Sequence, residues 1–208
     1  MCHGWPSCHT GRVLILLRHG RTVDNAEARI QGVSDTPLDP VGIDQARLAG
    51  EYIRDRWSID AVVTTSLQRS RQSAEHAGFA PERHEIDDRW REIAFGEYEG
   101  RKLDEVVGEL EARWHADIDY RPAGGESLAS LHARVAEACA EVTRRSMTEN
   151  VLVVSHATPI KSAVIWATRG HPAMILNLWV NPGSVSVLDH RAGNVVLAEF
   201  NRQIEMGP

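Results

Sequence analysis

The sequence has little cysteine and no long apolar run. Its three cysteines in 208 residues are an odd number and too few for the paired disulfides that stabilise small secreted domains. The longest apolar runs, such as Val13 to Leu17, are far shorter than the roughly 20 residues that a membrane-spanning helix needs. We therefore expect no membrane association, and the cysteine usage predicts a reducing, cytoplasmic location.

The sequence also lacks an excess of positive charge and the glycine motifs of nucleotide-binding domains. Its 23 Lys and Arg residues stand against 29 Asp and Glu residues, a formal net charge of −6. Dedicated nucleic-acid binders concentrate positive charge, so we expect no nucleic-acid partner. Neither a Walker A motif nor a dinucleotide-binding glycine pattern occurs. The length and the 42% hydrophobic content are instead typical of one ordinary globular domain.

Residues 1–11 are expected to form an N-terminal tail, followed by a single domain over residues 12–208. The tail lacks the basic and apolar regions of a signal peptide. It carries four side chains that can bind metals: Cys2, His3, Cys8 and His9. Their spacing fits no closed zinc pattern, so the sequence predicts no metal site.

Short apolar runs alternate with amphipathic segments, which is the pattern of an α/β domain with a mostly parallel sheet. The expected strands are 12–17, 60–65, a short edge strand at 83–86, 150–155, and a C-terminal hairpin of 184–188 and 195–200. The expected helices are about 40–57, 67–77, 103–116, 128–142 and 159–168. Asp39, Ser66 and Ser127 are expected to cap the first, second and fourth of these helices. The predicted fold is a three-layer α/β/α sandwich with a mostly parallel central sheet and a small helical cap at about 96–125.

Chemically notable side chains follow three of the expected strands. Ligands of open α/β sheets bind at the carboxyl ends of the strands. Arg18 and His19 follow the first strand, Arg69 comes soon after the second, and His156 follows the strand at 150–155. Guanidinium groups are suited to phosphate oxygens, so these residues predict a cage for a phosphoryl group. Position alone is equally compatible with arginines that pair with carboxylates at the rim of the sheet.

Five motifs, in this order, resemble the histidine phosphatase superfamily, which contains phosphoglycerate mutases and many acid phosphatases. They are Leu17 to Thr22 (LRHGRT), Ser66 to Ala74 (SLQRSRQSA), Asp88 to Gly100 (DRWREIAFGEYEG), Pro122 to Ser127 (PAGGES) and Val154 to Thr158 (VSHAT). The tripeptide RHG alone would be a weak signal, whereas the whole series is highly specific. Positions after about 170 match the family only in general layout.

The resemblance implies a role for each residue of the predicted cage. His19 in its neutral form would attack phosphorus and form a phosphohistidine, while its other ring nitrogen bonds a backbone carbonyl near Gly20. Arg18, Arg69 and His156 would hold the non-bridging oxygens and offset their charge. This positioning and electrostatic task needs neither a metal nor a cofactor.

The acid-bearing segment contains several carboxylates, and the resemblance selects one of them. Glu92, two residues beyond Trp90, is implied as the group that protonates the leaving alkoxide and then activates water. Glu97 and Glu99 lie in the same segment and compete for this role on sequence grounds.

Further residues are expected to contact the substrate. Asn25 and Gln31 follow the first motif, and the backbone N–H of Ala157 lies at a helix start. Arg21, where many members of the family carry Glu or Gln, would enlarge the positive mouth of the site or serve equally well on the surface. Six residues are candidates for the mouth of the pocket: Arg29, Arg101, Trp114, His115, Tyr120 and Arg121.

The resemblance implies a phosphatase that hydrolyses small phosphomonoesters. The run 155–161 (SHATPIK) is similar to broad-specificity acid phosphatases, which favours that branch. A cofactor-dependent phosphoglycerate mutase would use the same residues, although such mutases are typically longer and have a larger cap. A non-catalytic module for phosphorylated ligands is less favoured, because binding alone needs no general acid. The expected partner is a small phosphorylated metabolite, and family members often form homodimers.

Overall fold

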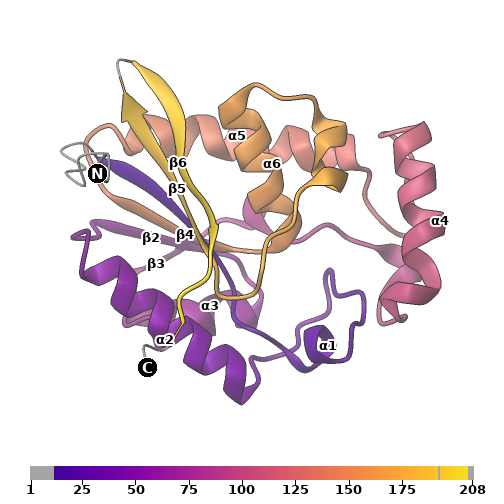
Figure 1. Cartoon of the computed structure of the whole chain (residues 1–208), viewed down its shortest axis with the longest axis horizontal. Coiled ribbons are helices and arrows are strands. Elements are labelled where there is room, and N and C mark those ends of the chain that lie inside the picture. Colours follow the sequence, from indigo (N-terminus) through magenta and orange to yellow (C-terminus); the bar gives the residue numbers. More distant parts are fainter. Residues whose placement is uncertain (1–11, 192, 206–208) are drawn as a thin grey trace, which may run out of the picture.

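The structure, a computed structural model, describes residues 12–191 and 193–205. Within these ranges the chain forms a six-stranded mixed sheet with helices on both faces (Figure 1). The strands are β1 Val13–Arg18, β2 Ala61–Thr64, β3 His84–Ile86, β4 Val151–Ser155, β5 Val185–Arg191 and β6 Asn194–Arg202. The predicted tail at 1–11, with its cysteines and histidines, lies outside the described residues.

The helices lie between the strands and beyond them. They are α1 Val23–Ala26, α2 Pro40–Arg54, α3 Gln68–His76, α4 Leu103–Ala116, α5 Leu128–Arg145 and α6 Ala157–Thr168. Short 3₁₀ helices are η1 Pro81–Arg83, η2 Asp88–Trp90, η3 Gly96–Tyr98 and η4 Pro172–Asn177. In the part of the chain that is described, no helix combines the length and the apolar character needed to cross a bilayer.

The strands follow the spatial order β3-β2-β4-β1-β5-β6. β3, β2, β4 and β1 run parallel, whereas β5 is antiparallel to β1 and β6 is antiparallel to β5. Parallel neighbours need crossover connections, which the intervening helices supply. The predicted α/β fold, with its edge strand β3 and its C-terminal hairpin, is therefore confirmed.

The β1 strand shows why helices cover both faces of the sheet. Its side chains alternate across the sheet, so Val13, Ile15 and Leu17 join the core cluster that contains residues of α2 and α3. Leu14 and Leu16 join the other cluster, which contains residues of α5 and α6. All five are at most 1% exposed. A run without polar alternation has to be buried on both faces, and Figure 1 shows the two helical layers on opposite sides.

Two of the three predicted helix caps are confirmed. The Asp39 Oδ1 atom accepts a hydrogen bond from the backbone N–H of Gly42 at 2.8 Å. The Ser127 Oγ atom accepts one from the backbone N–H of Ser130 at 3.1 Å. Each bond satisfies one of the free N–H groups of a first helical turn.

The predicted Ser66 cap is wrong. The α3 helix has Leu67 as its N-cap residue, with no hydrogen bond from that side chain. The backbone N–H of Gln68 instead donates to Asp35 Oδ1 at 2.7 Å. Asp35 is distant in the sequence, so no local pattern predicts this contact.

The α4 helix occupies the predicted cap and stands apart from the sheet, at the right of Figure 1. Its bounds agree with the expected range. Its buried residues Val106, Leu110 and Trp114 belong to the larger core cluster. Apolar packing against the core therefore holds α4 in place.

Candidate active site

The parallel pairing of β1 and β4 brings two histidines to one edge of the sheet. In this register Arg18 lies opposite Ser155, so the residues that follow them, His19 and His156, are neighbours. Their ring centroids are 5.1 Å apart, and the two residues are 3% and 0% exposed. The strand ends thus bring these histidines together, as the sequence predicts.

His19 has one ring nitrogen bonded to the backbone. Its Nδ1 atom lies 2.7 Å from the carbonyl oxygen of Gly20, and a carbonyl only accepts, so Nδ1 carries the hydrogen and Nε2 does not. Burial lowers the pKa of His19 well below its ordinary value, and the charges of Arg69 and Arg18 lower it further. His19 is therefore a neutral imidazole with a lone pair on Nε2.

Gly20 follows His19 because the α2 helix comes very close at this point. A Cβ atom here would lie only 2.1 Å from the carbonyl oxygen of Gly42 on α2. The backbone N–H of Gly20 donates to Ser73 Oγ at 3.0 Å, and Ser73 donates to the carbonyl oxygen of Arg69 at 2.7 Å. The turn that holds His19 is therefore fastened to both α2 and α3.

Arg69 and His156 form one hydrogen-bonded unit. Arg69 is fully buried and donates to His156 Nδ1 at 3.2 Å and to the carbonyl oxygens of Ser34 and Gly32 at 2.6 and 2.7 Å. His156 Nδ1 thus accepts, so Nε2 carries the hydrogen and donates to Thr65 Oγ1 at 3.0 Å. Burial, and then the charge of Arg69, lowers the pKa of His156 well below its ordinary value. The remaining guanidinium N–H groups of Arg69 are available for an anion.

Arg18 supplies the second buried positive charge of the site. Its Nη1 atom donates to the carbonyl oxygen of Val180 at 2.5 Å, and within the described residues its buried Nε atom has no hydrogen-bond partner. Burial lowers the pKa of Arg18 to about 10, against the effect of the nearby Glu92. The group therefore stays charged at neutral pH and has a spare donor, as an anion-binding side chain requires.

Glu92 is the carboxylate that faces the site. It is 6% exposed, and its Oε1 atom accepts hydrogen bonds from the backbone N–H groups of Ile93 at 2.9 Å and Thr158 at 3.3 Å. The first competitor, Glu97, bonds the backbone N–H of Ala123. These contacts place Glu92, and not Glu97, against the start of α6.

The other competitor, Glu99, organises loops. Its carboxylate accepts hydrogen bonds from the backbone N–H groups of Gly32, Val33 and Phe95 at 3.0 to 3.1 Å. Glu92 also accepts backbone hydrogen bonds, but it lines the cavity described below, whereas Glu97 and Glu99 do not.

A cavity of about 370 Å³ opens beside these groups. Arg18, Glu92 and Ala157 are among its lining residues, whereas His19, Arg69 and His156 are not. Since Arg18 directly precedes His19 and Ala157 directly follows His156, the histidines lie just behind the polar end of this cavity. A ligand whose main body occupies the cavity can therefore present one end to His19.

Two predicted substrate contacts, Asn25 and Gln31, also line the cavity. Asn25 Oδ1 accepts a hydrogen bond from the backbone N–H of Thr22, whose Oγ1 accepts one from the Asn25 backbone. The same Thr22 hydroxyl donates to Gln31 Oε1 at 2.9 Å. Gln31 is buried, and its Nε2 atom has no partner within the described ranges. It is a donor available to a ligand.

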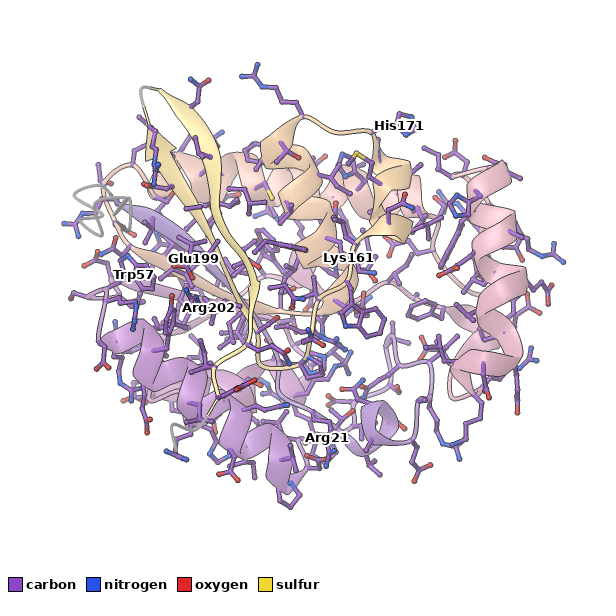
Figure 2. All side chains as sticks on the ribbon, in the orientation of Figure 1. Arg21, Trp57, Lys161, His171, Glu199 and Arg202 are labelled. Atoms are coloured by element: carbon purple, nitrogen blue, oxygen red, sulfur yellow. The ribbon has the colours of Figure 1, made fainter. Side chains whose placement is uncertain are left out.

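The structure does not support Arg21 as a substrate contact. Its Nε atom donates to Asp39 Oδ2 at 2.7 Å in an ion pair, and Arg21 is not among the lining residues of the cavity. Figure 2 shows Arg21 near α1 and far from Lys161, which does line the cavity. Arg21 thus pairs with the N-cap residue of α2, which fits the surface role that the sequence left open, and its contact with substrate stays a prediction.

The candidates for the pocket mouth also divide. Arg29 and Trp114 line the cavity. The remaining four are outside its lining: Arg101, His115, Tyr120 and Arg121. Which of these six residues line the cavity depends on which face of α4 and of its flanking loops turns inward. Tertiary packing sets that orientation.

The sequence prediction missed Lys161 on α6. This lysine lines the cavity, and burial lowers the pKa of its amine while the nearby Glu92 raises it. Its signal was available: Lys161 lies four residues after Ala157, and residues at this spacing share one helix face. A helix start that contributes Ala157 to the site therefore also turns Lys161 toward it.

Among the described residues, no cluster of three or more His, Cys, Asp or Glu side chains has the arrangement of a metal site. The polar groups of the site are instead two arginines, two histidines, one carboxylate and one lysine. This donor set suits a phosphoryl group that is bound by hydrogen bonds and charge.

Comparison with known proteins gives a consistent result. The family model described as Histidine phosphatase superfamily (branch 1) matches residues 14–203. A bifunctional protein of Mycobacterium tuberculosis is 33% identical over 194 residues, which are 91% of this chain and 53% of that protein. The chain thus spans about half the length of this relative. A probable phosphoglycerate mutase of Salmonella choleraesuis is 37% identical over 164 residues, 76% of this chain and 75% of that protein.

A solved structure also superposes over most of the chain. It is a mutant phosphoserine phosphatase from Entamoeba histolytica in complex with phosphoserine. The TM-score is 0.78 at 26% identity, over 91% of this chain and 96% of that chain. All of the site residues described above lie within the range matched by the family model.

Proposed function

Because this chain belongs to the histidine phosphatase superfamily, we propose that it is a phosphatase that hydrolyses small phosphomonoesters through a phosphohistidine on His19. The observation that carries the proposal is the neutral His19 ring, bonded through Nδ1 to Gly20 and placed beside two buried arginines. The likeness to a phosphoserine phosphatase supports it. The resemblance of the run 155–161 to broad-specificity acid phosphatases favours that branch.

The first step forms the phosphohistidine. The Nε2 lone pair of His19 attacks the phosphorus atom, and the bond from phosphorus to the ester oxygen breaks. The leaving oxygen takes a proton from the Glu92 carboxyl group, so the product departs as a neutral alcohol. The Gly20 carbonyl holds the hydrogen on Nδ1 throughout this step, which keeps the reactive lone pair on Nε2.

The second step releases phosphate. The Glu92 carboxylate, now deprotonated, removes a proton from water as the water oxygen attacks phosphorus. The bond between phosphorus and Nε2 breaks, inorganic phosphate leaves, and His19 returns to its neutral form. Glu92 regains its proton, so both residues are ready for another cycle.

The charge that gathers on the phosphoryl oxygens is held by groups already in place. Arg18 and Arg69 contribute fixed positive charges, the Nε atom of Arg18 is a spare donor, and the backbone N–H of Ala157 lies at the start of α6. His156 acts through Arg69: its Nδ1 atom accepts a hydrogen bond from the Nε–H group of Arg69. Because these groups are buried, their effect on the transition state is stronger than it would be in water.

Phosphoglycerate mutase activity is the second candidate, because a relative at 37% identity is described as a probable mutase. Both reactions begin with the same phosphohistidine. A mutase returns the phosphoryl group to the organic molecule and must exclude water. The short cap, in which α4 is the only long helix between 96 and 125, supports hydrolysis instead.

Phosphate release from a chromogenic phosphomonoester by the purified protein tests the proposal. We expect turnover that is abolished by His19→Ala, and an acid-labile phosphoryl group on the wild-type protein alone. Isomerisation of 3-phosphoglycerate that depends on 2,3-bisphosphoglycerate, and that exceeds hydrolysis, would favour the mutase. Phosphate binding without turnover would indicate the binding module and overturn the enzymatic proposal.

A further inference from the structure

The cavity has an apolar wall on the side away from the reacting groups. Val107, Leu110 and Trp114 of α4 line it, and η4 contributes Ile175 and Leu176. The α4 and η4 elements contact each other, so they form one continuous surface. Figure 1 shows α4 at the far right and the segment that follows α6, which contains η4, to its left.

Apart from Arg18, the cations that line the cavity are matched in number by its carboxylates. Arg29 is ion-paired with Glu27 at 2.8 Å and also donates to the carbonyl oxygen of Gly100. Lys161 lies in the field of two carboxylates that line the same cavity, Glu92 and Glu111. With Arg18 assigned to the phosphoryl group, the charged residues left in the lining are two cations, Arg29 and Lys161, and two carboxylates, Glu92 and Glu111, so the lining offers no net positive charge to a second anionic group of the ligand.

The size of the cavity bounds the size of the ligand. Its volume of about 370 Å³ equals about a dozen water-sized groups at roughly 30 Å³ each. The phosphoryl group itself reacts at His19, which lies behind the lining, so the cavity is available to the leaving group. A glycerol-sized leaving group would leave much of the apolar wall in contact with water.

From this wall, its charge balance and its volume we propose that α4 and η4 form a leaving-group subsite for large, uncharged, mainly apolar groups. The preferred substrates are phosphomonoesters of aromatic or long-chain alcohols, rather than phosphoglycerate or glycerol phosphate. This inference rests on the proposed phosphatase function and names its substrate class. Burial of apolar surface against Leu110 and Trp114 supplies the selectivity.

Paired esters test the subsite without changing the chemistry of the leaving group. Phenyl and 2-naphthyl phosphate both release a phenol, and propyl and hexyl phosphate both release a primary alcohol. We expect the larger member of each pair to have the higher kcat/KM, by about tenfold or more, because the added carbons are buried at a fewfold gain each. Equal values within both pairs, or a preference for 3-phosphoglycerate over all four esters, would overturn the inference.

A charged residue on the wall gives a sharper test. Val107 is half-buried and lines the cavity, so Val107→Asp places a carboxylate on the wall. We expect the naphthyl-to-phenyl ratio of kcat/KM to fall by roughly tenfold, since a pocket built for apolar groups loses about this much discrimination when one contact is spoiled. Val41→Asp is the matched control, because Val41 is exposed on α2 and outside the lining; its ratio should equal that of the wild type.

A binding experiment keeps the inference separate from the proposed function. Naphthylmethylphosphonate and methylphosphonate cannot be hydrolysed, and calorimetry reports their dissociation constants whether or not the protein is an enzyme. We expect the naphthyl compound to bind about tenfold more tightly or better, and Val107→Asp to remove most of the difference. Equal binding overturns the subsite even if esters are hydrolysed. Selective binding without any hydrolysis overturns the phosphatase proposal and keeps the subsite.

Discussion

The ends of β1 and β4 and the wall formed by α4 and η4 meet at one cavity but are built in different ways. At the strand ends, His19, Arg69 and His156 are each held by hydrogen bonds to backbone atoms or to one another. On the wall, Leu110 is held by packing alone and Trp114 by packing with one hydrogen bond to a backbone carbonyl. Hydrogen bonds fix the orientation of a side chain and the positions of its polar atoms, whereas packing fixes the shape and volume of a surface.

This difference predicts a division of labour. Chemistry needs reacting atoms held in one orientation before the substrate arrives. Selection among leaving groups needs a surface of the right size and polarity, which apolar side chains provide without directed bonds. Substitutions at the strand ends are therefore expected to lower kcat, and substitutions on the wall are expected to change the relative kcat/KM of different esters.

The largest effect is expected from removal of the nucleophile. His19→Ala should lower kcat for a phosphomonoester by at least about 10⁴-fold, as loss of an attacking group does in other covalent enzymes. Steady-state phosphate release gives the value. His115→Ala is the control, since His115 is exposed on α4 and outside the cavity lining. Retention of a tenth of the activity by His19→Ala would contradict the role of His19.

Removal of the proton donor should have the next largest effect. Glu92→Gln is expected to lower kcat by about 10² to 10⁴-fold for an alkyl ester. The loss should be smaller for p-nitrophenyl phosphate, whose leaving group needs less protonation. Glu97→Gln serves as the matched control, because Glu97 bonds a backbone N–H and its amide analogue can still accept. An equal loss for both esters would show that Glu92 acts on structure rather than on proton transfer.

A change on the wall should separate stability from selectivity. Leu110 is 3% exposed, lines the cavity and belongs to the larger core cluster, so Leu110→Ala should lower the free energy of unfolding by about 2 to 5 kcal/mol. It should also reduce the preference for naphthyl over phenyl phosphate. Leu131→Ala is the control: Leu131 is fully buried in the same cluster but does not line the cavity. If both variants changed the preference equally, loosened packing rather than the wall would be responsible.

The smallest effect concerns pH. The pKa values of His19 and His156 are lowered well below the ordinary value by burial and then by Arg69. On unfolding they regain a value near 6.5 and take up protons, so stability falls as pH falls below about 6.5. The free energy of unfolding should drop by up to about 1.4 kcal/mol per pH unit for each histidine.

Urea unfolding between pH 7 and 5.5 measures this slope. His156→Asn should reduce it, because one of the histidines whose pKa is lowered by burial is removed. His115→Ala is the control, since His115 is exposed on α4, and the slope should stay the same. Activity should persist as pH falls through 6.5, because His19 remains neutral there. A slope equal in wild type and His156→Asn would contradict the assigned burial effect.

Local patterns predicted much of the fold. Continuous apolar runs identified the strands buried on both faces, and the period of apolar residues identified α2 and α5. The Ser66 cap failed because the first N–H of α3 is taken by Asp35 from another loop. A competing partner from a distant segment leaves no trace in the local sequence.

The candidate site divides in the same way. The residues that follow the strand ends could be predicted because β1 and β4 are parallel neighbours. Residues that follow the carboxyl ends of parallel neighbours lie close together. Arg21 lies in the same motif, but its guanidinium is paired with Asp39, a contact that the motif alone did not predict. Lys161 was missed although the helical spacing from Ala157 pointed to it.

The amino-acid sequence by itself determined the alternation of strands and helices, the order of the motifs and the set of polar residues at the strand ends. These features depend on the type of each side chain and on its neighbours in the sequence, and the sequence gives both directly. The tertiary structure alone decided which carboxylate of the acid-bearing segment lines the cavity, which arginine has a donor free for an anion, and that η4 joins α4 in one apolar wall. Each of these outcomes depends on contacts between segments far apart in the sequence, where a single competing hydrogen bond or ion pair decides the role of a side chain.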